Sequence, residues 1–322
     1  MQQAPFHQLP DDPGTPATAF RVAADDGIGL RMALWRSATA GTLGSVLLFP
    51  GRTEFVEKYG PFVQNLITTG YDVLGIDWRG QGMSDRLQSD PRPGHIGEFA
   101  DYQRDVVEMV VAADKLDLPR PWHLLAHSMG GCIGLAALHD DLPVVSATFS
   151  APMWGINLYG VPRFVPQAIG WLAGRLGRGG HPFPGAGARG TYYVDEKFRT
   201  NLLTSDVDQW ARSLREAAYW PELTIGGASC HWLRAALAEC ARLAALPSPD
   251  LPTLIALGSR EAVVSTAAIR DRAGRTRNCT LLEIPEARHE VIMETPDCRR
   301  LFLQQFLAHI GSAAAEAAAQ DT

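Results

Sequence analysis

The sequence predicts an α/β fold in which helices cover both faces of a mostly parallel sheet. Apolar segments typical of strands alternate with helical segments along most of the chain, and one abrupt strand-to-helix turn is centred on Ser128. Residues 152–235 break this alternation, which resumes by Leu251. With 322 residues and 46% hydrophobic content, the chain is long enough for one such core and an insertion.

The elements follow from the hydrophobic pattern in chain order. The first two strands, residues 18–24 and 30–37, flank an Asp-Gly turn that is typical of a hairpin. Strands near residues 45–49 and 73–77 then alternate with helical stretches, as expected of a parallel sheet. The helical stretches lie near residues 55–69, 99–117 and 131–138, and the later strands at 144–150, 251–259 and 279–284.

The most informative segment is residues 121–131, P-W-H-L-L-A-H-S-M-G-G. An apolar run ends at Ser128, which lies among small or flexible residues and is followed by an Ala- and Leu-rich helical stretch. This pattern is typical of a nucleophile elbow, a strained turn that presents a serine oxygen at the edge of a sheet. Here Ala126 stands at the first glycine position of G-x-S-x-G and Gly130 at the second. We therefore interpret Ser128 as a catalytic nucleophile.

A serine hydroxyl needs a base, and the base needs an orienting acid. Behind such an elbow the chain order is serine, acid, histidine, each after a strand. Glu261 follows the predicted strand 251–259, and His289 lies in the loop after strand 279–284. The prediction is that His289 acts as general base and Glu261 holds its imidazole. Four other carboxylates remain as alternatives to Glu261: Asp271, Glu283, Glu286 and Glu290.

The oxyanion of the reaction also needs hydrogen-bond donors. The loop P-G-R-T-E-F follows the strand near residues 45–49, and Gly51 gives it freedom to turn an amide inward. We predict that the backbone N–H groups of Arg52 and Met129 form the oxyanion hole. The Arg52 side chain itself is interpreted as solvated.

These residues resemble the alpha/beta-hydrolases of the bacterial lysophospholipase and monoacylglycerol lipase type. The matching segments cover the core from about residue 18 to 310. They are F-P-G-R-T-E-F-V-E-K-Y (49–59), G-I-D-W-R-G-Q-G-M-S-D-R (75–86), A-H-S-M-G-G (126–131) and A-R-H-E (287–290). The chain departs from the family pattern at Pro50, where histidine is common, at Ala126, and at Glu261, where Asp is commoner.

The resemblance implies an eight-stranded sheet with an inserted helical cap, and hydrolysis of carboxylic esters of lysophospholipids or monoacylglycerols. Two alternatives stay open. One is a small-ester or carbon–carbon bond hydrolase with the same triad. The other is a non-catalytic ligand-binding protein on a hydrolase fold.

The expected division is an N-terminal extension (1–17), a core (18–151 and 236–310), a cap (152–235) and an Ala-rich tail (311–322). A cap above the elbow would create a concave apolar site. Arginines of the cap (Arg163, Arg175, Arg178, Arg189) are candidates for a lipid head group, although a solvated position is favoured. The aromatic residues expected to line an acyl pocket are Phe55, Trp154, Phe164, Trp171 and Trp220.

Other polar residues near these motifs are given structural roles. We expect Asp77 and Arg79 to tie down the G-Q-G loop, Glu54 and Lys58 to anchor a loop, and His127 to pack. The sequence predicts neither a metal site nor a cofactor, because His95, His139 and His231 lack ligand spacing and G-Q-G lacks a dinucleotide-site context.

A net charge of −6 without a basic run argues against a nucleic-acid partner. The five scattered cysteines and the absence of a signal-like N-terminus or an apolar stretch of membrane-spanning length predict a cytoplasmic protein. Peripheral contact with the inner membrane and the oligomeric state are left open.

Overall fold

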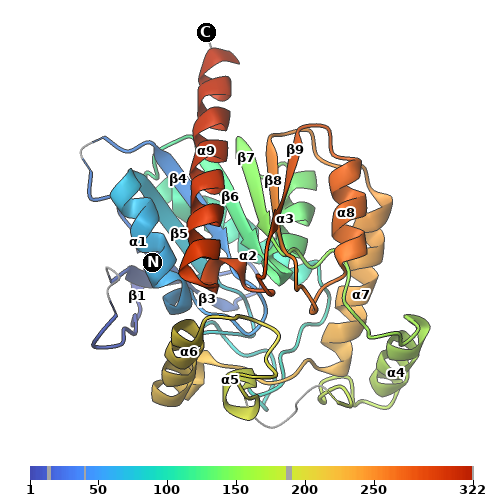
Figure 1. Ribbon diagram of the computed structural model, residues 1–322. Coiled ribbons are helices and arrows are strands. Elements are labelled where there is room, and N and C mark those ends of the chain that lie inside the picture. The colour runs from blue at the N-terminus through green and yellow to red at the C-terminus, as the bar shows by residue number, and fades with distance from the viewer. Residues whose placement is uncertain (13–15, 40, 186–190, 321–322) are drawn as a thin grey trace.

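The computed structural model describes residues 1–12, 16–39, 41–185 and 191–320. Its centre is a nine-stranded sheet with the spatial order β1-β2-β3-β5-β4-β6-β7-β8-β9 (Figure 1). In chain order the strands are β1 (Gln2–Gln3), β2 (Thr18–Ala23), β3 (Gly29–Trp35), β4 (Gly44–Phe49), β5 (Tyr71–Asp77), β6 (Trp122–His127), β7 (Ser146–Ser150), β8 (Thr253–Gly258) and β9 (Cys279–Ile284).

The sheet is mostly parallel, as predicted. Strands β4 to β9 pair with one another in parallel. At one edge of the sheet, β1 pairs with β2, β2 with β3, and β3 with β5, all antiparallel. The sequence predicted eight strands, and the ninth is the two-residue β1, which pairs with β2. Strand β6, which leads to Ser128, lies between β4 and β7 near the middle of the sheet.

Helices cover both faces of the sheet because its parallel strands are apolar on both sides. Within β4, Val46 and Leu48 pack on one face, and Leu47 and Phe49 on the other. A 3-10 helix, η1 (Val56–Tyr59), leads into α1 (Gly60–Thr69), which shares one face with α9 (Pro296–Gln320). The opposite face is covered by α2 (Asp101–Lys115), α3 (Met129–His139) and α8 (Thr266–Gly274).

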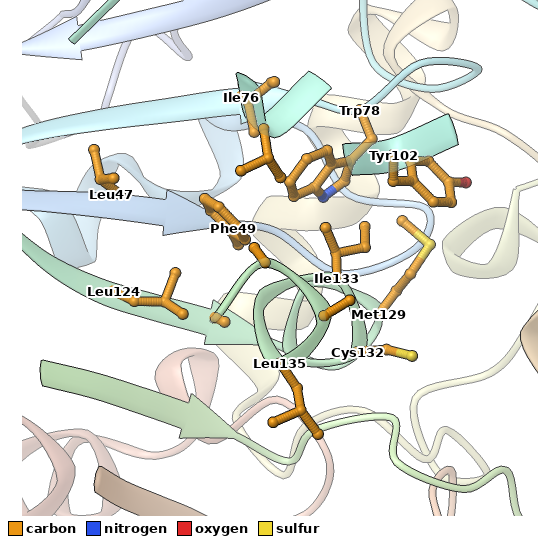
Figure 2. Close-up of a cluster of buried hydrophobic side chains, with 14 of the residues drawn as sticks. Leu47, Phe49, Ile76, Trp78, Tyr102, Leu124, Met129, Cys132, Ile133 and Leu135 are labelled. Carbon is orange, nitrogen blue, oxygen red and sulfur yellow. The ribbon is translucent and has the colours of Figure 1, made fainter. Parts of the chain in front are cut away.

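The helix behind Ser128 is embedded in this second core. Figure 2 shows α3 surrounded by side chains from β4, β5, β6 and α2. Ile133 and Met129 are fully buried in the cluster, together with Phe49 and Leu124. Because apolar residues enclose α3, its N-terminal turn has little freedom to move relative to the sheet.

The residues between β7 and β8 form α4 (Phe164–Arg175), α5 (Tyr192–Asp195), α6 (Val207–Tyr219), the 3-10 helix η2 (Pro221–Leu223) and α7 (Cys230–Ala245). In Figure 1, α4, α5 and α6 all lie below the strands, opposite the end where α9 projects, with α4 apart from α5 and α6. The predicted cap boundary at residue 235 falls inside α7, and α9 continues through the Ala-rich tail to Gln320.

None of the helices in the described ranges combines the length and the apolar character needed to cross a bilayer.

Candidate active site

The turn at Ser128 has the strained geometry of an elbow. Ser128 joins β6 to α3 with φ 50° and ψ −115°, a conformation that non-glycine residues rarely adopt. Its N–H donates to the carbonyl of Ser150 on the neighbouring strand, at 3.0 Å. A Cβ atom on Gly130 would lie 2.1 Å from the carbonyl oxygen of Phe49, so only glycine fits there. The turn therefore holds the hydroxyl against β4 and β7 in one position.

A chain of hydrogen bonds connects Ser128, His289 and Glu261, which follow the carboxyl ends of β6, β9 and β8. The Nε2 atom of His289 is 2.9 Å from Oγ of Ser128, and its Nδ1 atom is 2.8 Å from Oε2 of Glu261. Because a carboxylate only accepts, Nδ1 carries the proton and Nε2 accepts from the serine hydroxyl. His289 is 3% exposed and Ser128 9%. A hydroxyl, an imidazole and a carboxylate are thus aligned for proton transfer.

The second oxygen of Glu261 is held by the backbone. Its Oε1 atom accepts the N–H groups of Val263 and Val264, at 2.6 and 3.1 Å. These bonds orient the longer side chain that glutamate brings in place of aspartate. The four alternative carboxylates have other partners: Asp271 pairs with Arg275, Glu283 with Arg270, Glu286 with Arg260, and Glu290 with Lys58.

The surroundings shift the pKa values of these groups in opposite directions. Burial alone would lower the pKa of His289, but the negative charges of Glu261, Glu290 and Glu54 raise it above its usual range. Burial alone would raise the pKa of Glu261, but His289 and the two backbone N–H groups keep it below its usual range. Burial lowers the pKa of the neighbouring His127 to about 4, which keeps that ring neutral near pH 7.

The loop that carries His289 is held between the core and the insertion. A Cβ on Gly258 would lie 2.3 Å from the carbonyl oxygens of Ala287 and Arg288, so a glycine at the end of β8 lets this loop pass. On the other side, the N–H of Glu290 donates to the carbonyl of Leu203 at 2.8 Å. The insertion therefore contributes directly to the position of the imidazole.

The predicted oxyanion-hole residues lie in the elbow and in the loop after β4. Met129 is the first residue of α3, so its N–H has no partner within the helix. The backbone N–H of Arg52 makes no hydrogen bond to any residue that the structure describes. The next residue, Thr53, has φ 64°, so the loop is in an unfavourable conformation that its surroundings must maintain.

A buried cluster of charges maintains that loop. Glu54 accepts the N–H of Gly51 and the hydroxyl of Tyr59. Lys58 forms ion pairs with Glu54 at 2.7 Å and with Glu290 at 2.6 Å, and all three side chains are almost fully buried. Lys58 thus joins the loop after β4 to the residue that follows His289. The sequence predicted loop-anchoring roles for Glu54 and Lys58, which these contacts provide.

Two members of this cluster escaped the sequence reasoning. Glu290 was considered only as an alternative acid, and Tyr193, in α5, was not considered at all. The hydroxyl of Tyr193 donates to Oε1 of Glu290 at 3.0 Å. No local signal marked Glu290 as a partner of Lys58, because the sequence does not show that Lys58 is buried. No sequence signal pointed to Tyr193.

The structure separates the five aromatic residues predicted to line one acyl pocket. Phe55 is buried at the start of η1. Trp154 is packed edge-to-face on Phe149 and donates to the carbonyl of Gly131, so it belongs to the core. Trp220 stacks on His7. Phe164 and Trp171 lie on α4 and are 69% and 53% exposed. Aromatic content alone could not distinguish side chains that fill the core from those that face solvent.

The structural roles expected of other residues are compatible with their contacts. Asp77 accepts the N–H groups of Val56 and Met83 and pairs with Arg31, and Arg79 pairs with Asp105. Arg189 lies outside the described residues. In the part of the chain that is described, no three His, Cys, Asp or Glu side chains are grouped as metal ligands would be.

Comparison with known proteins shows which family the chain resembles. Residues 41–296 match the family described as serine aminopeptidase, S33. Lysophospholipase L2 of Escherichia coli strain K12 is 33% identical over 273 residues, which cover 80% of this chain and 77% of that protein. A probable lysophospholipase L2 of Haemophilus influenzae is 30% identical over 261 residues, with 80% and 81% coverage.

The fold is also shared with solved structures. A soluble variant of monoglyceride lipase from Saccharomyces cerevisiae superposes with a TM-score of 0.73 at 16% identity, covering 95% of this chain and 100% of that one. At this identity the similarity concerns the fold alone. The family match spans most of the chain, and two curated relatives align with most of its length. This chain belongs to the serine aminopeptidase S33 family of alpha/beta-hydrolases, together with these lysophospholipases.

Proposed function

We propose that this protein is a serine hydrolase that cleaves carboxylic esters of single-chain lipids through an acyl-enzyme on Ser128. The observation that carries the proposal is the continuous hydrogen-bonded path from Ser128 through His289 to Glu261. The names of the lysophospholipase relatives support a lipid ester as the substrate class.

In the proposed mechanism, Oγ of Ser128 attacks the ester carbonyl while Nε2 of His289 takes its proton. The positive charge that forms on the imidazole is stabilised by Glu261. The N–H groups of Arg52 and Met129 donate to the developing oxyanion, and each such donor typically contributes about 3 kcal/mol. His289 then protonates the leaving alcohol, and a water molecule, activated in the same way, hydrolyses the acyl-enzyme.

The proposal includes contact with aggregated lipid through α4. This helix exposes Phe164, Trp171 and Leu172 to solvent, as does Leu176 directly after it, and Arg175 lies over the Trp171 ring. Large apolar side chains beside arginines are typical of segments that rest on a lipid surface. A cytoplasmic location, at the inner membrane when lipid is bound, remains part of the proposal. The five cysteines, all free thiols, are compatible with a reducing compartment.

The first experiment measures fatty-acid release from a lysophospholipid and a monoacylglycerol that carry the same acyl chain, with Ser128→Ala as the blank. We expect release from at least one of them by the wild-type protein and none above background by the variant. In parallel, a fluorophosphonate probe at pH 8 should label the wild-type protein at Ser128.

Absence of labelling at Ser128 would contradict the enzyme assignment and favour a ligand-binding protein on the same fold. Labelling without release from either lipid would keep the nucleophile but exclude the lipid class. The substrate would then be sought among small esters or carbon–carbon bond substrates.

A further inference from the structure

The side chain of Arg52 occupies an unusual position beside the proposed active site. It extends from the loop after β4 toward the segment before α7, where its Nη2 atom donates to the carbonyl of Gly226 at 2.7 Å. Its guanidinium lies 4.9 Å from the centre of the Trp232 ring. A Cβ on Gly94 would lie 2.5 Å from Nη2, so a glycine makes room for the charged group. The solvated side chain predicted from sequence is instead packed between core and insertion.

This guanidinium carries a charge that the described residues do not neutralise. Arg52 forms no ion pair with a carboxylate in the described part of the chain, and its Nε atom is buried without a hydrogen-bond partner. Burial lowers the pKa of Arg52 to about 10, so the group stays charged near pH 7. Charges that leave water are normally paired, because an unpaired buried charge is costly. The residue as a whole is only half-buried, so an anion can reach the guanidinium and supply the missing countercharge.

Other arginines around the site are already satisfied. Arg288 donates to the carbonyls of Asn201 and Thr204, and Arg86 donates to those of Gly82 and Glu222. In contrast, the guanidinium of Arg52 makes a single hydrogen bond within the described residues, to the carbonyl of Gly226. Arg163 and Arg175, which the sequence suggested for the head group, belong to the segment around α4 rather than to the loop beside Ser128.

The covalent geometry of Arg52 indicates which part of a substrate would supply the anion. Its backbone N–H is the proposed donor to the ester oxyanion, and its guanidinium lies at the other end of the same residue. In a lysophospholipid, the glycerol unit lies between the ester carbonyl and the phosphorus. The number of bonds across this unit is comparable to the number of bonds between the backbone nitrogen and the guanidinium carbon of arginine. A planar guanidinium binds two phosphate oxygens at once, which an ammonium group cannot do.

We propose that the Arg52 guanidinium binds the phosphate of a lysophospholipid head group while the ester carbonyl lies at Ser128. The inference rests on the proposed function and deepens it, because it selects lysophospholipids over neutral monoacylglycerols. It assigns the head-group contact to the loop after β4 instead of to the arginines of α4.

The test compares kcat/KM for a lysophosphatidylcholine and a monoacylglycerol with the same acyl chain in the same detergent micelles. The informative quantity is the ratio of the two values, because a change at Arg52 also disturbs the adjacent oxyanion donor and lowers both. We expect the wild-type ratio to favour the lysophospholipid. Arg52→Gln should lower the ratio by about 10- to 100-fold, as expected for loss of a charged hydrogen bond. Arg52→Lys should give an intermediate ratio.

The matched control is Arg92→Gln, an exposed arginine in a neighbouring loop that pairs with Asp90. Its ratio should equal that of the wild type. An unchanged ratio in Arg52→Gln and Arg52→Lys, with both rates reduced equally, would overturn the assignment and leave Arg52 as a structural link to the insertion. Absence of both lipid activities in the wild type, by comparison, would overturn the proposed function itself.

A second measurement does not depend on the folding of a variant. Hydrolysis of a neutral short-chain ester by the wild-type protein is followed with glycerophosphocholine or inorganic phosphate as inhibitor. Competitive inhibition by glycerophosphocholine is expected, and it should weaken in Arg52→Lys. Inhibition by inorganic phosphate alone would indicate a site for the free anion and would overturn the head-group assignment, as would inhibition by neither compound.

Discussion

The loops at the carboxyl ends of the strands and helix α4 of the insertion differ in how completely their side chains are engaged. In the loops, Glu261 uses both carboxylate oxygens, and Lys58 is paired with two glutamates. On α4, Phe164 and Trp171 are largely exposed. The loops therefore hold their polar groups in one arrangement, whereas α4 leaves large apolar side chains mostly open to solvent.

The difference separates the two tasks of the proposed enzyme. Bond cleavage requires groups held in place before the substrate arrives, because reorganisation in the transition state slows the reaction. Contact with substrates of variable shape requires surface that is free to associate. If this division is right, substitutions in the loops should affect turnover and stability, and substitutions on α4 should affect the handling of lipid.

The largest effect is expected at the nucleophile. Ser128→Ala should lower kcat by on the order of 10⁶-fold, because the attacking atom is removed while the fold is retained. His289→Ala should reduce kcat about as much, and the double variant little further, since the two act as a unit. The measurement is turnover of a short-chain ester, with circular dichroism to check folding. Substantial residual turnover in Ser128→Ala would place the nucleophile elsewhere.

The next effect concerns Glu261 and the pH profile. Glu261→Gln should lower kcat by about 10⁴-fold, because the imidazole loses the charge that stabilises its protonated form. In the wild type, activity needs neutral His289, whose raised pKa places the acidic limb of kcat/KM at higher pH than an ordinary histidine would. Removal of the carboxylate charge should move this limb to lower pH. Full turnover with an unshifted limb would mean that another group orients the imidazole.

The buried cluster offers a test of stability. Lys58→Met leaves Glu54 and Glu290 without their shared cation and should lower the free energy of unfolding by about 3–5 kcal/mol. The matched change Arg270→Met breaks the exposed pair with Glu283 and should cost less than about 1 kcal/mol. Urea denaturation measures both. Equal losses in the two variants would show that the cluster does not hold the loops.

The smallest effect on stability is expected on α4. Phe164→Ser and Trp171→Ser change exposed side chains, so the free energy of unfolding should stay within about 0.5 kcal/mol of the wild type. The ratio of the rate on lipid vesicles to the rate on a dissolved short-chain ester should fall by about tenfold in the double variant, because apolar contact with lipid is lost. An unchanged ratio would remove α4 from the lipid-contact proposal.

Strand and helix positions were predictable because each is encoded locally. Strand 279–284 agrees in full with β9, and the predicted strand 251–259 exceeds β8 by two residues at the start and one at the end. The motif around Ser128 and the order of acid and histidine after it were enough to select Ser128, Glu261 and His289. The structure brings these three residues into hydrogen-bond contact. The predicted acyl pocket had no such local signal, and its aromatic residues are dispersed over the core, the start of η1, the segment between α6 and η2, and α4.

The sequence by itself determined the sheet, the elbow and the order of Ser128, Glu261 and His289, because hydrophobic period and turn chemistry act between residues close in the chain. Only the tertiary structure decided which acid faces the imidazole, that Lys58 joins Glu54 to Glu290, and that Arg52 has no carboxylate partner among the described residues. Those relations join residues from segments distant in sequence. Burial and charge pairing between such segments are set by packing, which no local pattern records.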